Sequence, residues 1–582
     1  MKRAIVLIAL SLMLTISAHA GDNGRARERW VEKTLRSMTL DEKIGQMIIP
    51  AGPPSGNFRP VDSDEMNTIR RNITEFHVGG YHTFGGDVAA NALTSNEMQR
   101  MAKLPLLITA DVEGGPAYVL FGATRLPLAM SFGAAGDPQL AYEAGKLTAQ
   151  ECRAVGVNWI WYPVSDVNNN PENPIINIRS YGENPESVAK FVTAYIRGAQ
   201  ENGVIATAKH FPGHGDVATD SHIGMPVLDV PRQRFESLEL VPFRAAIAAG
   251  VDSIMTTHIY MPQLEPEKNV PATLSKNIVT GILRDELHFE GVVVTDAMTM
   301  GGIAKYFTPA EATLRAVKAG VDVLLFSPSV ETAFNTIKAA VASGEIPVSR
   351  IDESARRVLR LKAQLDLANP KNRFVDVNRL PETVGTKPHR DFAQQVADSA
   401  VTLVRDERGV LPLKPSPDTR LTQIVMLDSR TGWREGTVGR VLTAEMAKKF
   451  PRAVTVTVDD QSTPNEFDMV RKLAQISDTI VVNAFIRVAA FRGSIDLTSA
   501  EMSLLRDLVA TNKPFVLTVF GSPFALTHMT EMPSYIVTYD TTPGAELAAV
   551  RTITGEIPFR GKLPVSLPGL YPIGHGLTAP VR

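Results

Sequence analysis

The chain has 582 residues, of which 44% are apolar and 21% are charged, a composition typical of a globular protein and not of a disordered one. This length predicts two domains, or three. The formal net charge is −2 and no basic stripe or tail occurs, so neither nucleic acid nor an anionic membrane surface is indicated as a partner.

The first twenty residues have the pattern of a secretory signal peptide. Two basic residues at positions 2 and 3 precede an apolar run from Ala4 to Leu14, and small residues at 18–20 suit cleavage before Gly21. The run is too short to cross a bilayer, and no later stretch is apolar enough to do so. We therefore expect residues 1–20 to be removed and the mature protein to be secreted or periplasmic.

Cys152 is the only cysteine, so an internal disulfide is excluded. It lies within a helical pattern over residues 140–155, which indicates a core residue and not a nucleophile.

Between residues 21 and 367, short β-branched or apolar runs alternate with amphipathic segments such as 138–154, 185–202 and 232–249. Eight alternating units of this kind predict an α/β fold in which the strands form a (β/α)8 TIM-like barrel. The eight expected strands are 44–51, 78–84, 105–111, 157–164, 204–209, 251–258, 291–296 and 321–326.

Residues 368–388 are rich in proline, asparagine and charge, which predicts a linker. The alternation then returns over residues 389–582, so we expect a second domain there, an open α/β sandwich. Its expected strands are 422–427, 454–458, 479–483, 515–519 and 535–538. No phosphate-binding fingerprint occurs in it.

Polar residues follow five of the eight expected barrel strands. In a barrel of parallel strands the carboxyl ends meet at one face, where catalytic groups gather. Five such strand ends together predict an active site across the mouth of the barrel. The residues concerned are Asp111 and Glu113, Asp166, Lys209 and His210, His258, and Asp296.

The run KHFPGHGD (209–216) is the richest of these segments in chemical groups. Its proline and glycines predict a loop that leaves the fifth strand. His210, His214 and His222 raise the alternative of a metal site, but the Pro-Gly turn removes the helical i, i+4 spacing of a zinc motif, so no metal is expected. A second alternative is that these histidines only satisfy backbone groups.

The sequence Asp220-Ser221-His222 follows in the same loop region. A carboxylate two residues from a histidine can bind one ring nitrogen, which fixes the tautomer and raises the basicity of the other nitrogen. Such a pair can protonate a leaving oxygen and later activate water. Ser221 as an acyl-transfer nucleophile is the alternative, but it lacks the glycines of a nucleophile elbow.

Asp296 ends the buried strand GVVVTD (291–296). A carboxylate in this position is a candidate nucleophile, or electrostatic stabiliser, at a barrel mouth. The alternative is a helix N-cap for the residues that follow. The residues alone leave both open.

The runs KHFPGHG…DSH (209–222), GVVVTDAM (291–298), ITADVEGG (108–115) and TRLP (124–127) resemble glycoside hydrolase family 3. More narrowly, they resemble its β-N-acetylglucosaminidase branch. Residues 400–413, GEIP (555–558) and GKLPVS (561–566) resemble the family's second domain, so the resemblance covers nearly all of the mature chain.

The resemblance implies a role for each matching residue. Asp296 corresponds to the nucleophile that forms a glycosyl-enzyme intermediate, His222 to a histidine acid/base, and Asp220 to the carboxylate that orients it. The positions implied to contact the sugar are Asp111, Arg179, Lys209, His210 and, with a less defined duty, His258. No cofactor is implied.

One motif departs from the family pattern. The family commonly has an arginine after Glu-Gly-Gly, whereas this chain has Pro116 after Glu113-Gly114-Gly115. The contact of that arginine is therefore lost or made by another residue, which affects substrate preference and not the catalytic pair.

The function implied is that of a retaining exo-β-N-acetylglucosaminidase. Peptidoglycan fragments are the first expected substrates and chitin oligosaccharides the second. The alternatives are a β-glucosidase or xylosidase of the same family, an N-acetylglucosamine phosphorylase that uses phosphate in place of water, and a non-catalytic cell-wall sugar-binding protein. The DSH loop argues against the glucosidase and xylosidase branch.

Overall fold

The computed structural model describes residues 24–52, 63–427, 438–486 and 497–581. The predicted signal peptide, residues 1–20, lies outside the described residues. In the described part, helices and largely parallel strands alternate along the chain, so the fold is α/β, as the sequence predicts.

Eight parallel strands in the first part of the chain pair in a closed order. They form the sheets β1–β10, β2–β4–β6 and β7–β8–β9. Isolated parallel bridges join these sheets, from Ala51 to His82, from Trp159 to Ile205 and from Val294 to Val323. The strands are β1 (Ile48–Ile49), β2 (Gly80–His82), β4 (Leu107–Ala110), β6 (Trp159–Ile160), β7 (Thr207–Phe211), β8 (Ser253–Thr256), β9 (Val292–Val294) and β10 (Leu324–Leu325). Each lies within one of the eight segments predicted as strands or, for β7, extends past its end.

The side chains between these strands form a separate apolar cluster. It contains Ile49, Leu107, Trp159, Met255 and Leu325, which come from β1, β4, β6, β8 and β10 and are buried. Gly80 of β2 is required by close packing, because a Cβ there would lie 2.1 Å from the Leu107 carbonyl oxygen. β3 (Gly86–Asp87) and β5 (Leu120–Phe121) form a small parallel pair of their own.

Helices follow most of these strands, after a first helix over residues 24–37. They are α2 (Leu40–Gly45), α3 (Asp64–Thr74), α4 (Val88–Met101), α5 (Ala129–Ala135), α6 (Pro138–Ala154), α7 (Pro185–Glu201), α8 (Arg232–Ser237), α9 (Leu240–Ala248), a π-helix (Asn277–Glu286), α10 (Gly301–Ala304), α11 (Pro309–Ala319), α12 (Val330–Ala342) and α13 (Val348–Gln364). Their starts follow from the sequence: Asp137 caps α6 ahead of Pro138, and Thr308 and Glu311 form a capping box for α11.

One segment predicted as helical is interrupted in the structure. Residues 232–249 form two helices, α8 and α9, which meet at Leu238 and Glu239. Pro242 explains the break, because it has no N–H for the Leu238 carbonyl and its ring clashes with that group in a continuous helix. Cys152 is fully buried in α6, where the sequence predicts a core residue.

Residues 368–388 contain only short helical turns before a longer helix begins. These are α14 (Pro370–Arg373), a 3-10 turn (Val377–Arg379), α15 (Leu380–Thr383) and the start of α16 (Lys387–Ala400). Hydrogen bonds of 2.9 Å in both directions join the Asn96 side chain to the backbone of Val375, so this segment follows the surface of α4.

The rest of the chain forms a six-stranded sheet in the order β11–β16–β15–β14–β12–β13. Its strands are β11 (Thr402–Asp406), β12 (Leu421–Leu427), β13 (Val454–Asp459), β14 (Thr479–Ile486), β15 (Phe515–Gly521) and β16 (Ser534–Val537). The helices are α17 (Arg440–Lys449), α18 (Pro464–Ile476), α19 (Ser499–Ala510) and α20 (Pro543–Ile553). Five strands coincide with the predicted segments. The sequence pattern missed β11, which is the one antiparallel strand of this sheet and lies at its edge.

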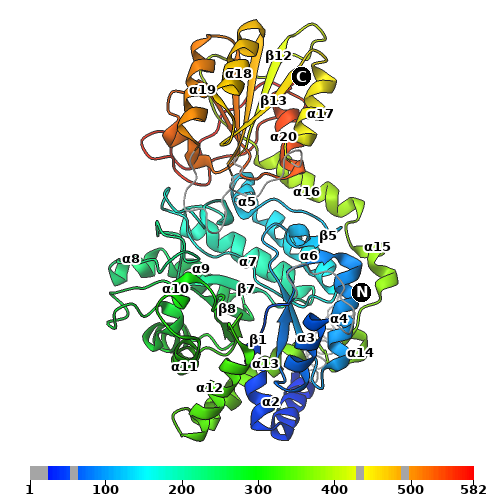
Figure 1. Cartoon of the computed structure of the whole chain (residues 1–582), viewed down its shortest axis with the longest axis vertical. Helices are drawn as coiled ribbons and strands as arrows, with labels where there is room; N and C mark the ends of the chain where they lie inside the picture. Colours follow the sequence, from blue (N-terminus) through cyan, green and yellow to red (C-terminus); the bar gives the residue numbers. More distant parts are fainter. Residues whose placement is uncertain (1–23, 53–62, 428–437, 487–496, 582) are drawn as a thin grey trace, which may run out of the picture.

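Figure 1 shows the eight parallel strands and their helices in the lower part of the molecule and the six-stranded sheet in the upper part, with α16 between them. The two parts share packing, because Met130 and Ala134 of α5 belong to the apolar cluster on one face of the upper sheet. Glu183 accepts hydrogen bonds from the Ser566 backbone N–H and hydroxyl, at 2.7 and 2.9 Å.

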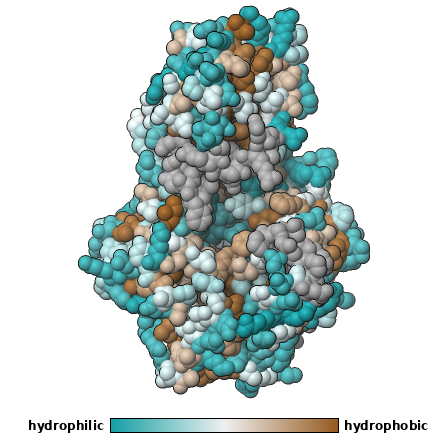
Figure 2. Space-filling view, viewed as in Figure 1, coloured by the Kyte–Doolittle hydropathy of each residue, from teal (hydrophilic) through white to brown (hydrophobic). Residues whose placement is uncertain are grey.

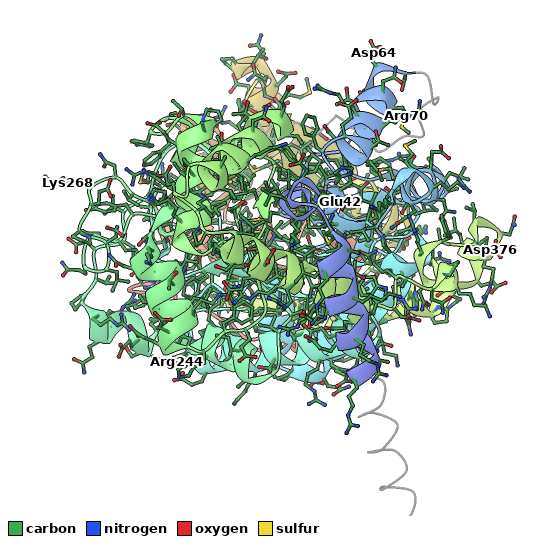
Figure 3. The ribbon with its side chains drawn as sticks, turned by 90° about the horizontal axis from the view of Figure 1, so that it is seen from below. Glu42, Asp64, Arg70, Arg244, Lys268 and Asp376 are labelled. Carbon is green, nitrogen blue, oxygen red and sulfur yellow. The ribbon has the colours of Figure 1, made fainter. Side chains whose placement is uncertain are left out.

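The surface is mixed in character. On the face drawn in Figure 2, hydrophobic residues occur in small groups among hydrophilic ones. Seen from below, in Figure 3, Glu42 lies near the middle of the view, and Asp64, Arg70, Arg244, Lys268 and Asp376 lie around the rim. Among the helices of the described residues, none combines the length and the apolar character that a membrane crossing requires.

Candidate active site

The polar residues that the sequence places after the strands do gather at the carboxyl ends of the eight parallel strands. Electrostatic interactions and ion pairs join them into two groups. One surrounds Asp296, and the other is a row of paired charges that includes Asp111 and Lys209. Because Lys209 and His210 are consecutive residues of β7, the two groups are neighbours.

Asp296 lies two residues after β9, and its backbone N–H binds the Thr256 carbonyl of β8 at 3.1 Å. Its Oδ1 accepts the Ala297 N–H at 2.7 Å. Burial raises the pKa of Asp296, but the charges of His210, His258 and His222 and the Ala297 N–H outweigh burial and bring the pKa to about 2. The carboxylate is therefore ionised at neutral pH.

The alternative of Asp296 as a helix N-cap is wrong. The next helix, α10, begins at Gly301, its N-cap is Met300, and no side chain caps it. The Asp296 carboxylate instead binds the N–H of the residue that follows it.

His258 follows β8 and lies beside Asp296, with its side chain buried. Its Nε2 is 3.0 Å from the Ala297 carbonyl oxygen and its Nδ1 is 2.9 Å from the Thr273 hydroxyl. A carbonyl only accepts hydrogen bonds, so Nε2 carries a proton. Burial lowers the pKa of His258. Both ring nitrogens thus have protein partners, and the imidazole fixes the backbone next to Asp296.

His222 and Asp220 form the pair that the sequence predicts. His222 Nδ1 is 2.7 Å from Asp220 Oδ1, which also accepts the His222 backbone N–H at 2.9 Å. The Asp220 side chain is 1% exposed and that of His222 is 25% exposed. The loop lies against the start of α10, because the Ser221 and His222 carbonyls accept the N–H groups of Gly302 and Gly301.

Ser221, between them, is buried and bound to His214. Its Oγ lies 2.8 Å from His214 Nε2. Burial lowers the pKa of His214 to about 4, so this imidazole is neutral. A serine that is 2% exposed has no approach for an acyl substrate, which argues against Ser221 as a nucleophile.

Asp166 organises the loop that follows β7. It accepts hydrogen bonds from His210 Nδ1 at 2.7 Å and from the His214 backbone N–H at 2.6 Å. Burial raises the pKa of Asp166, but His210, His214 and the His214 N–H outweigh burial and lower it. His210 therefore binds a carboxylate and His214 binds a serine. The described residues contain no cluster of side chains placed to hold a metal ion.

Four alternating charges form a row beside this loop. Arg179 donates to Glu113 through Nε at 2.7 Å and Nη2 at 2.8 Å. Lys209 Nζ lies 2.7 Å from Glu113 and 3.0 Å from Asp111. Burial raises the pKa of Glu113, but Arg179 and Lys209 outweigh burial and hold it well below its usual range. Asp111 is the most exposed member of the row, with 34% of its side chain accessible.

Arg125 occupies the space next to the Glu-Gly-Gly turn, where the family's usual arginine is replaced by Pro116. A Cβ on Gly114 would lie 2.1 Å from its Nη1, and its guanidinium lies 5.0 Å from the centre of the Tyr118 ring. Asp540, from the loop after β16, is close enough for Arg125 to lower its pKa, although burial raises it overall. This loop of the second part therefore reaches the neighbourhood of the site.

Sequence reasoning placed Glu113 and Asp166 at strand ends without assigning either a role, and it missed His82. Glu113 and Asp166 orient the predicted site residues and were visible as carboxylates after strands. His82, the last residue of β2, lies 3.9 Å from Asp111 through Nε2. The signal that could have found it is the same strand-end rule applied to the second strand.

Comparisons with known proteins identify the family of the chain and proteins of similar fold. The model of the glycosyl hydrolase family 3 N-terminal domain matches residues 39–361. A Cellulomonas fimi protein described as "Beta-N-acetylglucosaminidase/beta-glucosidase" is 29% identical, over 92% of this chain and 95% of its own length.

Two solved structures cover nearly the whole chain. A family 3 β-N-acetylglucosaminidase from Paenibacillus sp. str. FPU-7 has a TM-score of 0.81 and 34% identity, over 91% of this chain and 99% of its own. A structure titled "Beta-glucoside phosphorylase BglX" has a TM-score of 0.82 and 26% identity, over 93% of this chain and 96% of its own.

Proposed function

This chain belongs to glycosyl hydrolase family 3, and from that premise we propose that it is a retaining exo-β-N-acetylglucosaminidase. It removes terminal β-linked N-acetylglucosamine through a covalent glycosyl-enzyme intermediate on Asp296. The observation that carries the proposal is the Asp220–His222 pair next to an ionised Asp296. The names of the similar proteins from Cellulomonas fimi and Paenibacillus include β-N-acetylglucosaminidase, and the first also includes β-glucosidase.

For the fold we propose one closed (β/α)8 barrel over residues 21–367, a linker over 368–388 and an open α/β sandwich over 389–582. The cyclic order of the strand pairs and the apolar cluster between the strands support the barrel. Apolar clusters on both faces of the six-stranded sheet support the sandwich.

Asp296 is the proposed nucleophile. Its low pKa keeps the carboxylate charged, and Oδ2 receives no hydrogen bond from the described residues, whereas Oδ1 binds Ala297. An oxygen without a donor is the one that can attack the anomeric carbon. His258 supports this geometry through the Ala297 carbonyl.

His222 is the proposed acid/base. Because Asp220 binds Nδ1, Nε2 is the nitrogen that donates a proton to the leaving oxygen in the first step and removes one from water in the second. The nearly complete burial of Asp220 strengthens its hold on the imidazole.

The proposed sugar contacts are Asp111, Arg179, Lys209 and His210. Arg179 uses three of its five N–H groups and Lys209 two of its three within the described residues, so each keeps donors for sugar hydroxyls. Asp111 is accessible and accepts hydrogen bonds. For His258, which has two protein partners, we propose a positioning role.

A second candidate is phosphorolysis, in which phosphate replaces water as the acceptor. It is favoured by the similarity to a β-glucoside phosphorylase and by the use of an imidazole, which as a neutral base repels an anion less than a carboxylate does.

The aglycone is proposed to come from peptidoglycan fragments, with chitin oligosaccharides as the second source.

Export is proposed from the leader pattern alone, and N-terminal sequencing of the protein recovered from its host tests it. An N-terminus at Gly21 is expected, and an intact Met1 contradicts it.

Product analysis of a matched substrate pair tests the activity. The 4-nitrophenyl β-glycosides of N-acetylglucosamine and of glucose are incubated with the protein, with and without phosphate. Preferential release of N-acetylglucosamine supports the hydrolase, and N-acetylglucosamine 1-phosphate supports the phosphorylase. Preference for the glucoside supports the glucosidase branch. If neither substrate is turned over, the remaining hypothesis is a non-catalytic sugar-binding protein.

A further inference from the structure

His82 ends β2 at the same face as the other site residues, and its side chain is fully buried. It has no proposed role in the acid/base pair, at the nucleophile or in the row of paired charges.

The tautomer of His82 is fixed by its neighbours. Trp161 Nε1 lies 3.0 Å from His82 Nδ1, and an indole N–H can only donate a hydrogen bond. Nδ1 is therefore the acceptor, and the proton of the neutral ring is on Nε2. Burial lowers the pKa of His82 to about 4, so the ring is neutral at physiological pH.

The orientation of the ring is fixed as well. Phe84 and Phe326 contact it edge to face, with centroid separations of 4.7 and 4.8 Å, and the Trp161 ring lies nearly parallel to it at an interplanar angle of 11°. Thr109 Oγ1 lies 3.0 Å from Nδ1, on the same side as the indole. The imidazole cannot turn Nε2 away from Asp111 without breaking these contacts.

Nε2 is buried and has no hydrogen-bond partner among the described residues. Its separation from Asp111 Oδ2, 3.9 Å, is too long for a hydrogen bond. A buried donor without an acceptor is unfavourable, so native proteins seldom leave one unless another group binds there. The fixed N–H thus points to a ligand atom that accepts.

A sugar hydroxyl has the donor and acceptor groups to bridge the two side chains. It can accept the hydrogen bond from Nε2–H and donate its own proton to the Asp111 carboxylate. An oxygen about 2.8 Å from each atom would see them at an angle of about 90°, which is near the angle between donors and acceptors at a hydroxyl.

We propose that His82 is a specificity-determining residue that, together with Asp111, binds one hydroxyl of the non-reducing sugar. The inference rests on the proposed function, since it takes the sugar to bind at this face. It adds to Asp111 a neutral donor that recognises an oxygen at one position of the ring.

The test is a set of 4-nitrophenyl N-acetyl-β-glucosaminides that lack the 3-, 4- or 6-hydroxyl, one at a time. They are compared with the parent substrate for the wild type, His82→Leu and His82→Gln. Leucine removes the donor, whereas the glutamine amide keeps an N–H near the position of Nε2. We expect His82→Leu to lower kcat/KM for the parent about 3- to 10-fold, and glutamine to restore part of it.

For one deoxy substrate alone, the wild type and His82→Leu should then have equal kcat/KM, because the partner atom is missing from both. The same substrate should also reduce the effect of Asp111→Asn, leaving the part that comes from its ion pair with Lys209. A structural role for His82 would lower kcat/KM by one factor across the whole set and would overturn the inference. Unchanged kinetics in His82→Leu would overturn it too.

A Trp161→Phe variant provides an independent check, because it removes the donor that fixes the tautomer. It should show the same single-hydroxyl dependence, with a smaller loss. Thermal unfolding of each variant identifies losses that come from instability. If the wild type cleaves none of the substrates, the proposed function itself is wrong; if it cleaves them and His82→Leu loses activity uniformly, only the inference is wrong.

Discussion

His214 Nε2 lies 2.8 Å from Ser221 Oγ, and this hydrogen bond joins the loop that leaves β7 to the loop that carries Asp220 and His222. Asp166 fixes the first loop through His210 and the backbone of His214. The position of the acid/base pair is therefore coupled, through Ser221 and His214, to a buried carboxylate of the neighbouring strand end.

Ser221→Ala breaks this coupling and leaves His222 less well placed. We expect kcat/KM to fall about 3- to 10-fold, in line with the loss of one hydrogen bond, with little change in the unfolding temperature. Steady-state kinetics measure it, and Ser221→Thr, which keeps the hydroxyl, is the control. A loss of several orders of magnitude in Ser221→Ala would instead identify the serine as the nucleophile.

Asp296→Asn should lower kcat by about 1,000-fold or more, because the amide cannot form the glycosyl-enzyme bond. A slow fluorinated substrate should label the peptide that contains Asp296 in the wild type, as seen by mass spectrometry. Asp229→Asn, on an exposed segment, is the matched control and should retain full activity. Label on any other peptide refutes the assignment.

His222→Ala should affect substrates according to their leaving groups. Hydrolysis of a methyl glycoside, whose leaving group needs a proton, should slow by about 100-fold or more, and that of a dinitrophenyl glycoside by less than about 10-fold. Rates for a series of aryl glycosides measure this dependence. Equal losses along the series would show that His222 is not the acid.

Glu113→Gln removes the carboxylate that pairs with both Arg179 and Lys209, so Arg179 loses its ion-pair partner and Lys209 keeps Asp111. Removal of one member of a buried charge group is strongly unfavourable, so the free energy of unfolding should fall by about 3 kcal/mol and activity should be lost with it. Urea unfolding measures the loss. Glu143→Gln, in an exposed pair with Lys146, should change stability by less than about 1 kcal/mol.

Asp252 gives a prediction about pH that is independent of the proposed function. Burial raises its pKa from 3.8 to about 7. Its charge is therefore less favourable in the folded than in the unfolded protein, and stability is lost as pH rises from about 4 through about 7. Because the side chain is partly exposed and binds Gln364, we expect Asp252→Asn to stabilise the protein at pH 8 by only about 1 kcal/mol.

At pH 4 the Asp252 carboxyl is protonated in the folded protein, so the same substitution should change little. Urea unfolding of both proteins at the two pH values provides the comparison. Equal stabilisation at pH 4 and pH 8 would show that the charge is not the cause.

The sequence predicted much of the architecture because its signals are local. Each of the eight strands lies in or overlaps a segment with a short β-branched or apolar run, and helices such as α6 and α7 begin at a capping residue followed by proline. β11 was missed because it is an edge strand whose pairing with β16 depends on residues about 130 positions away. Residues 232–249 were misread because the helical period continues across Pro242.

The candidate site divides in the same way. The sequence by itself determined which residues end the strands. The spacing of Asp220 and His222 predicted their contact, because residues two positions apart in one turn are close in space without help from distant parts of the chain.

Only the tertiary structure decided the remaining pairings. Glu113 meets Arg179 across 66 residues, and Trp161 fixes the proton of His82 across 79 residues. Hydrogen bonds and charges act over a few ångströms, so the partner of a buried group depends on which strand ends the fold brings together, and no local pattern contains that information.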